Sequence, residues 1–318
     1  MVLNVILLII GLALVVFGAD WLVDGASGIA RRLGVSEFVI GLTIVGFGTS
    51  CPELVVSLTG AFSGISDVAI GNVIGSNIFN VLLILGFTAF LMPIGITPAN
   101  RRRDIPITAG VTVLLILAGM SKTILGLGSD SLGLVWGIVF LLLFAAYIFM
   151  CFKFDDKSAD VEEPGKTYKL SASILLTVAG LAALIFGGRL FVNEAVDIAH
   201  SLGISEKFIA ITILAGGTSL PEFVTCIVAA AKKKGQLALG NILGSNVFNI
   251  LLILGASALV MPISFENVNF VDLGVLLLSA VLVFTSAFTG KKNVIDRFDG
   301  ALMLFAYVGY MVWLFLGL

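Results

Sequence analysis

The sequence predicts an all-α membrane protein with ten transmembrane helices, arranged as two five-helix repeats of inverted topology. Three observations lead to this fold class. Hydrophobic residues make up 59% of the 318 positions and charged residues 12%, whereas a soluble domain has about 25% charged residues. Ten apolar segments approach the roughly 20 residues that a helix needs to cross a bilayer. The second half of the chain repeats the first at a constant offset.

The ten apolar segments are separated by short polar connections. The first lacks a basic leading region and a small-residue cleavage site, so we predict a retained helix rather than a signal peptide. The predicted spans are residues 2–22, 36–62, 68–92, 104–121, 131–152, 171–192, 205–231, 236–261, 269–289 and 297–317.

An internal repeat links the two halves. The block Gly-Thr-Ser-Cys-Pro-Glu at 48–53 returns as Gly-Thr-Ser-Leu-Pro-Glu at 217–222, an offset of 169. Between 41–94 and 210–263, 26 of 54 positions are identical without an insertion. Shared hydrophobicity alone does not produce such agreement, so each half is interpreted as one five-helix unit.

The repeat also defines the predicted domains and their orientation. Five is an odd number of helices, so the second unit has to cross the membrane in the direction opposite to the first, as in many secondary transporters. Fifteen of the 18 basic residues follow odd-numbered spans, the exceptions being Lys122, Arg189 and Lys207. The positive-inside rule then predicts a multi-pass protein of the plasma (inner) membrane with both termini extracytoplasmic. The first predicted repeat is 1–152, and its repeated block lies at about 36–94. A cytoplasmic linker at 153–169 follows. The second predicted repeat is 170–318, with its block at about 205–263.

Each repeated block places a glutamate inside an apolar span. A charge near the bilayer centre costs about 2.5–3.5 kcal/mol on insertion scales, so Glu53 and Glu222 require a compensating role, and the role we predict is cation binding. Thr49 lies four residues before Glu53 on the same helix face, with Ser50 beside it. Pro52 removes a backbone donor and clashes with the carbonyl of Gly48, which predicts a kinked or partly unwound helix with free carbonyls at 46–49. Thr218, Ser219 and Pro221 repeat this pattern before Glu222.

The spans that follow carry polar stripes. Asn72, Ser76 and Asn80 fall at four-residue steps, and Asn241, Ser245 and Asn249 repeat them. The pairs Gly71–Gly75 and Gly240–Gly244 are small-xxx-small patterns that predict close helix contacts. For the asparagines at 72, 77, 241 and 246, helix packing and ion binding both remain open.

Folding one half onto the other would bring Glu53 and Glu222 together, surrounded by oxygen ligands. Oxygen-only ligands suit hard cations, and calcium takes about six to eight of them. Two carboxylates balance one divalent ion, and sodium ions could use parts of the same set. Transition metals are disfavoured because no His or Cys pair flanks the glutamates.

The paired Gly-Thr-Ser-x-Pro-Glu and Gly-Asn-x-x-Gly-Ser-Asn blocks resemble the two repeats of the sodium/calcium exchanger family, within the cation/calcium antiporter superfamily, in its short prokaryotic form. The resemblance implies ten helices, inverted halves and sodium-driven calcium transport by alternating access. Calcium and sodium ions and the lipid bilayer would be the partners of a protein that works as a monomer without an organic cofactor. The implied ion ligands are Glu53, Glu222, Thr49, Thr218, Ser50, Ser219, Ser76, Ser245, Asn80 and Asn249, with backbone carbonyls at Gly46 and Ala215.

Several alternatives stay open or are disfavoured. Some relatives, including potassium-coupled members, have aspartate where this chain has Asn249, which argues against potassium dependence and leaves it as an alternative only. A buried glutamate could carry a proton, so proton-coupled calcium antiport is a second alternative. A cation channel would need a continuous polar lining, whereas the polar residues here gather at one depth. With one histidine and no Ser-His, Cys-His or Walker A arrangement, neither an enzyme nor an ATP-driven pump is expected. No nucleic-acid partner is expected.

The remaining charged residues and the first helix of each half complete the predictions. Asp24, Glu37, Glu206 and Asp104 lie near predicted helix ends, where we expect them to be solvated or capping. The first and sixth helices lack ion-binding blocks but are rich in glycine, and they are expected to slide against the rest during transport.

Overall fold

The computed structural model describes residues 2–126, 128–156, 168–203, 215–289 and 293–317, most of them helical. Two pairs of short strands and four π-helical segments, labelled η, interrupt the α-helices. In chain order the elements are α1 Val2–Leu33, α2 Glu37–Ile40, η1 Gly41–Val45, α3 Gly46–Thr49, α4 Cys51–Phe62, α5 Ser66–Ile78, η2 Phe79–Leu85, α6 Gly86–Leu91, β1 Ile94–Gly95, η3 Asn100–Asp104, α7 Ile105–Gly119, α8 Ser121–Leu125, β2 Ser131–Leu132, α9 Leu134–Lys153, α10 Leu170–Ser201, α12 Ala215–Gly217, α13 Leu220–Ala231, α14 Gly235–Val247, η5 Phe248–Leu254, α15 Gly255–Val260, β3 Ile263–Ser264, α16 Phe270–Phe288, β4 Val294–Ile295 and α17 Arg297–Leu316.

The helices fit a multi-pass membrane protein. In the described part of the chain, seven are long and apolar enough to cross a membrane, or eight when the bent pair Glu37–Thr49 and Cys51–Phe62 is taken as one span. Of the other predicted spans, 104–121 contains the 15-residue α7, and 205–231 lies partly outside the described residues.

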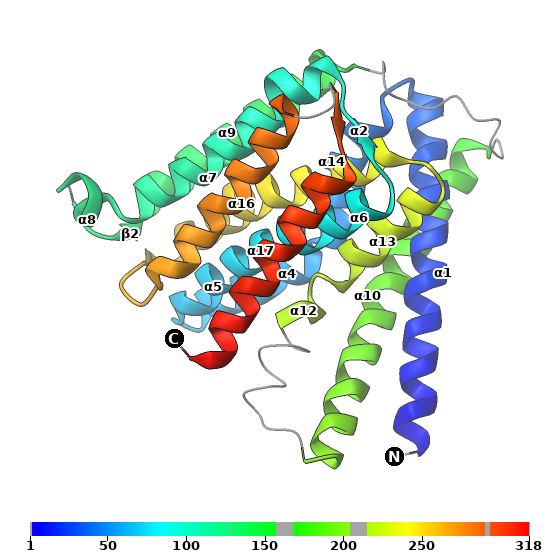
Figure 1. Ribbon diagram of the computed structural model, residues 1–318, viewed down its shortest axis with the longest axis horizontal. Helices are drawn as coiled ribbons and strands as arrows, with labels where there is room; N and C mark the ends of the chain where they lie inside the picture. The colour runs from blue at the N-terminus through cyan, green and yellow to red at the C-terminus, as the bar shows by residue number, and fades with distance from the viewer. Residues whose placement is uncertain (1, 127, 157–167, 204–214, 290–292, 318) are drawn as a thin grey trace.

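The two longest helices, α1 and α10, run side by side and form one flank of the molecule (Figure 1). Glycines bring their backbones together: a Cβ added at Gly11 would lie 2.7 Å from the backbone nitrogen of Phe191, and one at Gly25 would lie 2.6 Å from that of Thr177. Since the residue number rises along α1 as its partner's number falls along α10, the two helices are antiparallel.

Both helices extend beyond the predicted spans 2–22 and 171–192, to Leu33 and Ser201. The added turns contain polar residues that hydropathy alone assigns to a loop. For α1 the helix continues because its glycine-lined face stays in contact with α10 through Gly25 and Gly28.

The expectation of solvated or capping side chains is wrong for Glu37 and Asp104, which are buried and ion-paired. Asp24 is ion-paired but keeps 32% of its side chain exposed, and position 206 lies outside the described residues. Oδ1 of Asp24 lies 2.6 Å from Nζ of Lys232, Oε1 of Glu37 lies 2.6 Å from Nζ of Lys234, and Oδ1 of Asp104 lies 2.9 Å from Nε of Arg103. A carboxylate withdrawn from water needs a paired charge, and basic residues of the connecting segments supply it.

The π-helical segments η2 and η5 occupy equivalent positions of the two halves, since adding 169 to Phe79–Leu85 gives Phe248–Leu254. π-helical turns are rare and often mark functional sites. Both contain an asparagine of the predicted polar stripes, Asn80 and Asn249.

The short strands join the two halves. β1 pairs antiparallel with β4, with Ile94 opposite Ile295, and β2 pairs with β3, with Leu132 opposite Ile263. In each pair, a strand that follows the third or eighth predicted helix meets a strand that precedes the last helix of the other half.

The span from Gly235 to Val260 lies at the centre of the molecule, with 83% of its apolar window buried, against 22% for α1. Close contact predicted at Gly240 and Gly244 is confirmed, because a Cβ at either would collide with the backbone carbonyl of Phe38 or Leu42. The matching partners of Gly71 and Gly75 would be 207 and 211, which lie outside the described residues, so that prediction stays untested.

Candidate functional site

Each glutamate of the repeated blocks follows a break in its helix. In the first half α3 ends at Thr49, α4 begins at Cys51, and the two parts are bent by 48°. Pro52 lies in the first turn of α4, where its missing N–H is tolerated. The predicted kink is therefore confirmed. The second half repeats it, with α12 ending at Gly217 and α13 beginning at Leu220.

The breaks place Glu53 and Glu222 in the first turns of α4 and α13. The free N–H groups and helix dipole of a first turn favour a negative charge. Each glutamate is only 1% exposed. Burial this complete requires charge compensation.

Serines of opposite halves bind the two carboxylates reciprocally. Oγ of Ser50 donates to Oε1 of Glu222 at 2.8 Å, and Oγ of Ser219 donates to Oε1 of Glu53 at 3.1 Å. Thr49 and Thr218 directly precede these serines in the chain, and Oγ1 of Thr49 donates to the backbone oxygen of Val45 at 3.1 Å. The two repeated blocks thus interlock, each supplying hydroxyls to the glutamate of the other.

The second carboxylate oxygens have no such partner. Oε2 of Glu53 and Oε2 of Glu222 are buried and accept no hydrogen bond from any described residue. Buried polar atoms are nearly always paired with protein, water or an ion. The unpaired oxygens are therefore candidate ligands for a cation.

The asparagines of η2 and η5 show the same arrangement. Nδ2 of Asn80 donates to Oδ1 of Asn246 at 3.1 Å, and Nδ2 of Asn249 donates to Oδ1 of Asn77 at 2.9 Å. Their own amide oxygens, Oδ1 of Asn80 and Oδ1 of Asn249, are buried without a partner among the described residues. Each asparagine thus uses its donor group to fix its orientation and leaves its acceptor available.

The asparagines at 77 and 246 were ambiguous in the sequence, and the structure gives them an orienting role. Nδ2 of Asn77 also donates to the backbone oxygen of Asn246 at 3.2 Å, across the interface between halves. The signal that could have revealed them is their exact recurrence at the repeat offset, combined with the need of each site amide for a fixed partner.

Asn72 and Asn241, which also belong to the polar stripes, have a different structural role from Asn80 and Asn249. Nδ2 of Asn72 donates to the backbone oxygen of Glu53 at 3.1 Å and to Oγ of Ser57 at 2.9 Å. Oδ1 of Asn241 accepts from Oγ1 of Thr49 at 3.2 Å. These contacts hold the broken segments in place.

The remaining predicted ligands include Ser245, Ser76 and Ala215, which differ in the contacts that the structure gives them. Oγ of Ser245 lies 2.9 Å from Oγ of Ser50 and 3.5 Å from the carbonyl oxygen of Gly46. Ser76 is buried on α5. Ala215 begins α12, directly after a segment outside the described residues.

The donor set suits a hard cation that is bound reversibly. Within the described residues, no group of three or more His, Cys, Asp or Glu side chains could hold a metal. The charge of the site comes from two carboxylates and the rest from neutral oxygens, a combination favourable to calcium or sodium and unfavourable to softer metals.

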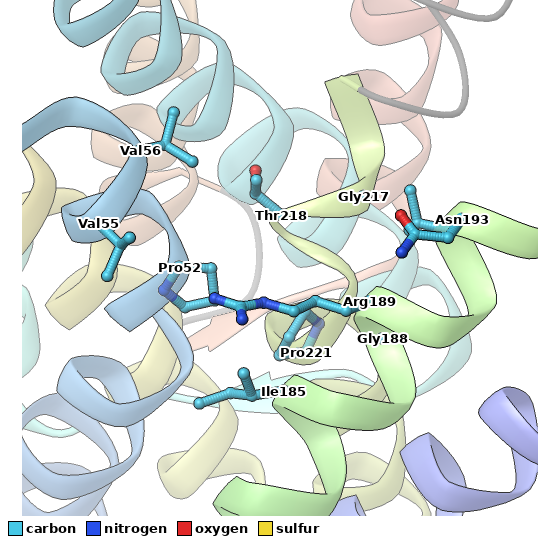
Figure 2. Close-up of a pocket in the computed structure, with 11 residues that line it drawn as sticks. Pro52, Val55, Val56, Ile185, Gly188, Arg189, Asn193, Gly217, Thr218 and Pro221 are labelled. Carbon is cyan, nitrogen blue, oxygen red and sulfur yellow. The ribbon is translucent and has the colours of Figure 1, made fainter. Parts of the chain in front are cut away.

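A cavity of about 190 Å³ lies between α4 and α10 (Figure 2). We call it the α4–α10 pocket, because these two helices supply most of its lining residues, and α12 and α13 contribute one residue each. Its lining residues are Pro52, Val55, Val56, Ile185, Gly188, Arg189, Val192, Asn193, Gly217, Thr218 and Pro221. Pro52 and Pro221 directly precede Glu53 and Glu222 in the chain.

Comparison with known proteins identifies relatives along the whole chain. The sequence profile of the sodium/calcium exchanger protein family matches residues 3–153 and 172–316. The chain is 38% identical over 324 residues to the putative antiporter CaxA of Alkalimonas amylolytica, covering 99% of each sequence. It is 34% identical over 346 residues to the sodium/calcium exchanger MaX1 of Methanosarcina acetivorans, covering 98% of each.

Solved structures agree with this result. The sodium-calcium exchanger NCX_Mj, soaked with 2.5 mM Na⁺ and 1 mM Sr²⁺, matches with a TM-score of 0.84 at 34% identity over 98% of each chain. The same exchanger soaked with 2.5 mM Na⁺ and 0.1 mM Ca²⁺ also gives a TM-score of 0.84, at 32% identity over 98% of each chain.

Proposed function

The chain belongs to the sodium/calcium exchanger family, and from this premise we propose that its antiport takes place at a site built around Glu53 and Glu222. The protein is a membrane antiporter of sodium and calcium. The proposed site rests on one observation: of the ten buried side-chain oxygens that lack a partner among the described residues, four form two repeat-related pairs, Oε2 of Glu53 and Glu222 and Oδ1 of Asn80 and Asn249.

In the proposed binding mode, the two carboxylates neutralise one calcium ion while neutral oxygens complete its coordination. The additional ligands are the hydroxyls or amides of Thr49, Thr218, Ser50, Ser219, Ser76, Ser245, Asn80 and Asn249, and the carbonyls of Gly46 and Ala215. Sodium ions would use smaller subsets of the same oxygens. Because the two kinds of ion compete for shared ligands, calcium and sodium would be transported alternately rather than together.

We further propose ten transmembrane helices in two inverted repeats, 1–152 and 170–318, joined by the cytoplasmic linker 153–169. Three contacts between the halves support this arrangement. α1 and α10 are antiparallel, β1 pairs with β4 and β2 with β3, and the serine–glutamate hydrogen bonds are reciprocal. One chain supplies both inverted repeats of the proposed exchanger, and this favours a functional monomer.

Orientation and mechanism follow from the same symmetry. The positive-inside rule favours extracytoplasmic termini in the plasma (inner) membrane. Alternating access would come from α1 and α10 sliding as one unit over the central helices, because their glycine-lined contact packs the two helices closely against each other.

The experiment is calcium flux in proteoliposomes under separately imposed sodium, potassium and proton gradients. We expect an outward-directed sodium gradient to drive calcium uptake, and potassium or proton gradients to leave it unchanged. Uptake that follows a potassium or a proton gradient would replace sodium by one of those coupling ions. Calcium uptake without any countergradient would indicate a channel.

A further inference from the structure

The two halves differ in how they surround the ion site. On the side of α10, the α4–α10 pocket leads to Pro52 and Pro221, the residues that precede the two glutamates. The equivalent place in the other half lies between α1 and α13, which pack against each other. There Nζ of Lys232 lies 2.7 Å from Oδ1 of Asp20 and 2.6 Å from Oδ1 of Asp24. The described residues therefore leave a pocket on the α10 side, the open side, and pack together on the opposite, closed side, while both glutamates stay buried.

The open pocket contains a positive charge. Arg189 on α10 is exposed, and Figure 2 shows its side chain running across the pocket in the direction of Pro52. The repeat allows this position to be compared with its counterpart in the first half. At the offset of 169, Arg189 corresponds to Asp20, and Asn193 of the pocket corresponds to Asp24. The second half thus carries a cation and a neutral amide where the first half carries two carboxylates.

We propose that Arg189 is a specificity-determining residue whose charge disfavours divalent relative to monovalent cations in the α4–α10 pocket. This inference rests on the proposed function of Glu53 and Glu222. A cation moving through the pocket towards the glutamates passes the guanidinium group of Arg189. Coulomb repulsion doubles when the charge of the moving ion doubles. At a separation of about 10 Å in a water-like dielectric, one fixed charge lowers the local concentration of a monovalent cation roughly twofold and that of a divalent cation roughly fourfold.

The test measures initial calcium uptake into sodium-loaded proteoliposomes against external calcium, with and without external sodium as competitor. Arg189→Gln should lower the calcium concentration for half-maximal uptake about two- to fivefold, and should lower the sodium concentration for half-inhibition by a smaller factor. Arg189→Glu, which restores the sign of charge found at Asp20, should give the larger shift. Raising ionic strength with choline chloride should shrink both shifts, because counter-ions screen charges in an open pocket.

Two controls separate charge from other effects. Arg189→Lys keeps the charge and should behave as the unmodified protein. Arg102→Gln removes an equal charge from an exposed position in η3 that does not line the pocket, and should leave both half-saturation values unchanged. The inference is overturned if Arg189→Gln leaves both half-saturation values unchanged, or if Arg189→Lys shifts them as much as Arg189→Gln does. If the unmodified protein shows no sodium-driven calcium uptake, the proposed function itself fails, and that result is distinct from either of these.

Discussion

Oγ of Ser50 lies 2.8 Å from Oε1 of Glu222, although the two residues are 172 positions apart and belong to opposite halves of the chain. Ser219 and Glu53 form the equivalent contact in the other direction. Neither half therefore contains a complete glutamate environment by itself. The proposed site would form only when both broken helices meet, which would tie ion binding to the relative position of the two halves.

The first prediction concerns the carboxylates. Glu53→Gln and Glu222→Gln each keep the shape of the side chain but remove one of two negative charges. Losing one partner of a buried charge pair costs about 3–5 kcal/mol, so calcium affinity should fall by at least about 100-fold. Titration calorimetry with calcium on the purified variants measures this directly, and sodium-driven flux should be lost with it.

The control for this prediction is Glu266→Gln, which changes an exposed carboxylate and should leave binding and flux unchanged. Thermal unfolding of each variant checks that it folds. Near-normal calcium binding in either site variant would refute the paired-carboxylate assignment.

The second prediction separates a ligand asparagine from an orienting one. Asn249→Ala removes the unpartnered Oδ1 and should weaken the stabilisation that calcium gives in thermal unfolding. Asn77→Ala instead leaves Nδ2 of Asn249 unpaired, which should lower the free energy of unfolding by about 1–3 kcal/mol even without calcium.

Because these two asparagines touch, their effects should not add. The double variant should show a coupling energy of about 0.5–3 kcal/mol in a double-mutant cycle. Additive losses would mean that the 2.9 Å hydrogen bond between them does not contribute to stability.

The third prediction tests the contact between α1 and α10. A Cβ at Gly18 would lie 2.8 Å from the backbone nitrogen of Leu184, so Gly18→Ala should separate the helices and cost about 1–3 kcal/mol. Gly110→Ala on α7 is the matched control, since its added Cβ meets nothing within 4 Å among the described residues. There the substitution should be neutral or stabilising by up to about 1 kcal/mol. Equal unfolding temperatures for the two variants would contradict the close-contact argument.

The fourth prediction concerns the closed side of the site. Lys232 bridges Asp20 and Asp24, and Lys232→Gln should weaken the contact of α1 with α13 by about 0.5–2 kcal/mol, as expected for two partly exposed ion pairs. The measurement is thiol labelling in a chain whose native cysteines are replaced. Thr225→Cys, buried on α13, should label slowly, and the Lys232 substitution should accelerate it.

Val56 provides the internal reference for that experiment, because it occupies the repeat position of Thr225 but lines the open pocket. Val56→Cys should label quickly in both backgrounds. If Thr225→Cys labels as quickly as Val56→Cys before Lys232 is changed, the assignment of a closed side is wrong.

The structure confirms those sequence predictions that depend on local chemistry. The kink at Pro52 follows from the covalent structure of proline, and the apolar segments follow from composition. The ends of α1 and α10 were misplaced, because hydropathy does not register that the polar final turns of α1 continue along the start of α10, where Gly28 meets Ser173. Glu37 was misjudged because its basic partner, Lys234, comes from the other half of the chain, and Asp104 because the structure buries it beside its neighbour Arg103.

The amino-acid sequence by itself determined the duplication, the two broken helices and the residue types offered to the ions, because each is written in a local pattern that recurs at one offset. Tertiary structure alone decided which oxygens stay unpaired, how Asn77 and Asn246 orient their neighbours, and which side of the site is open. Those features arise from contacts between segments more than 150 residues apart. The repeated blocks that contain Glu53 and Glu222 are so similar that, read alone, they do not show how the surroundings of the two copies differ.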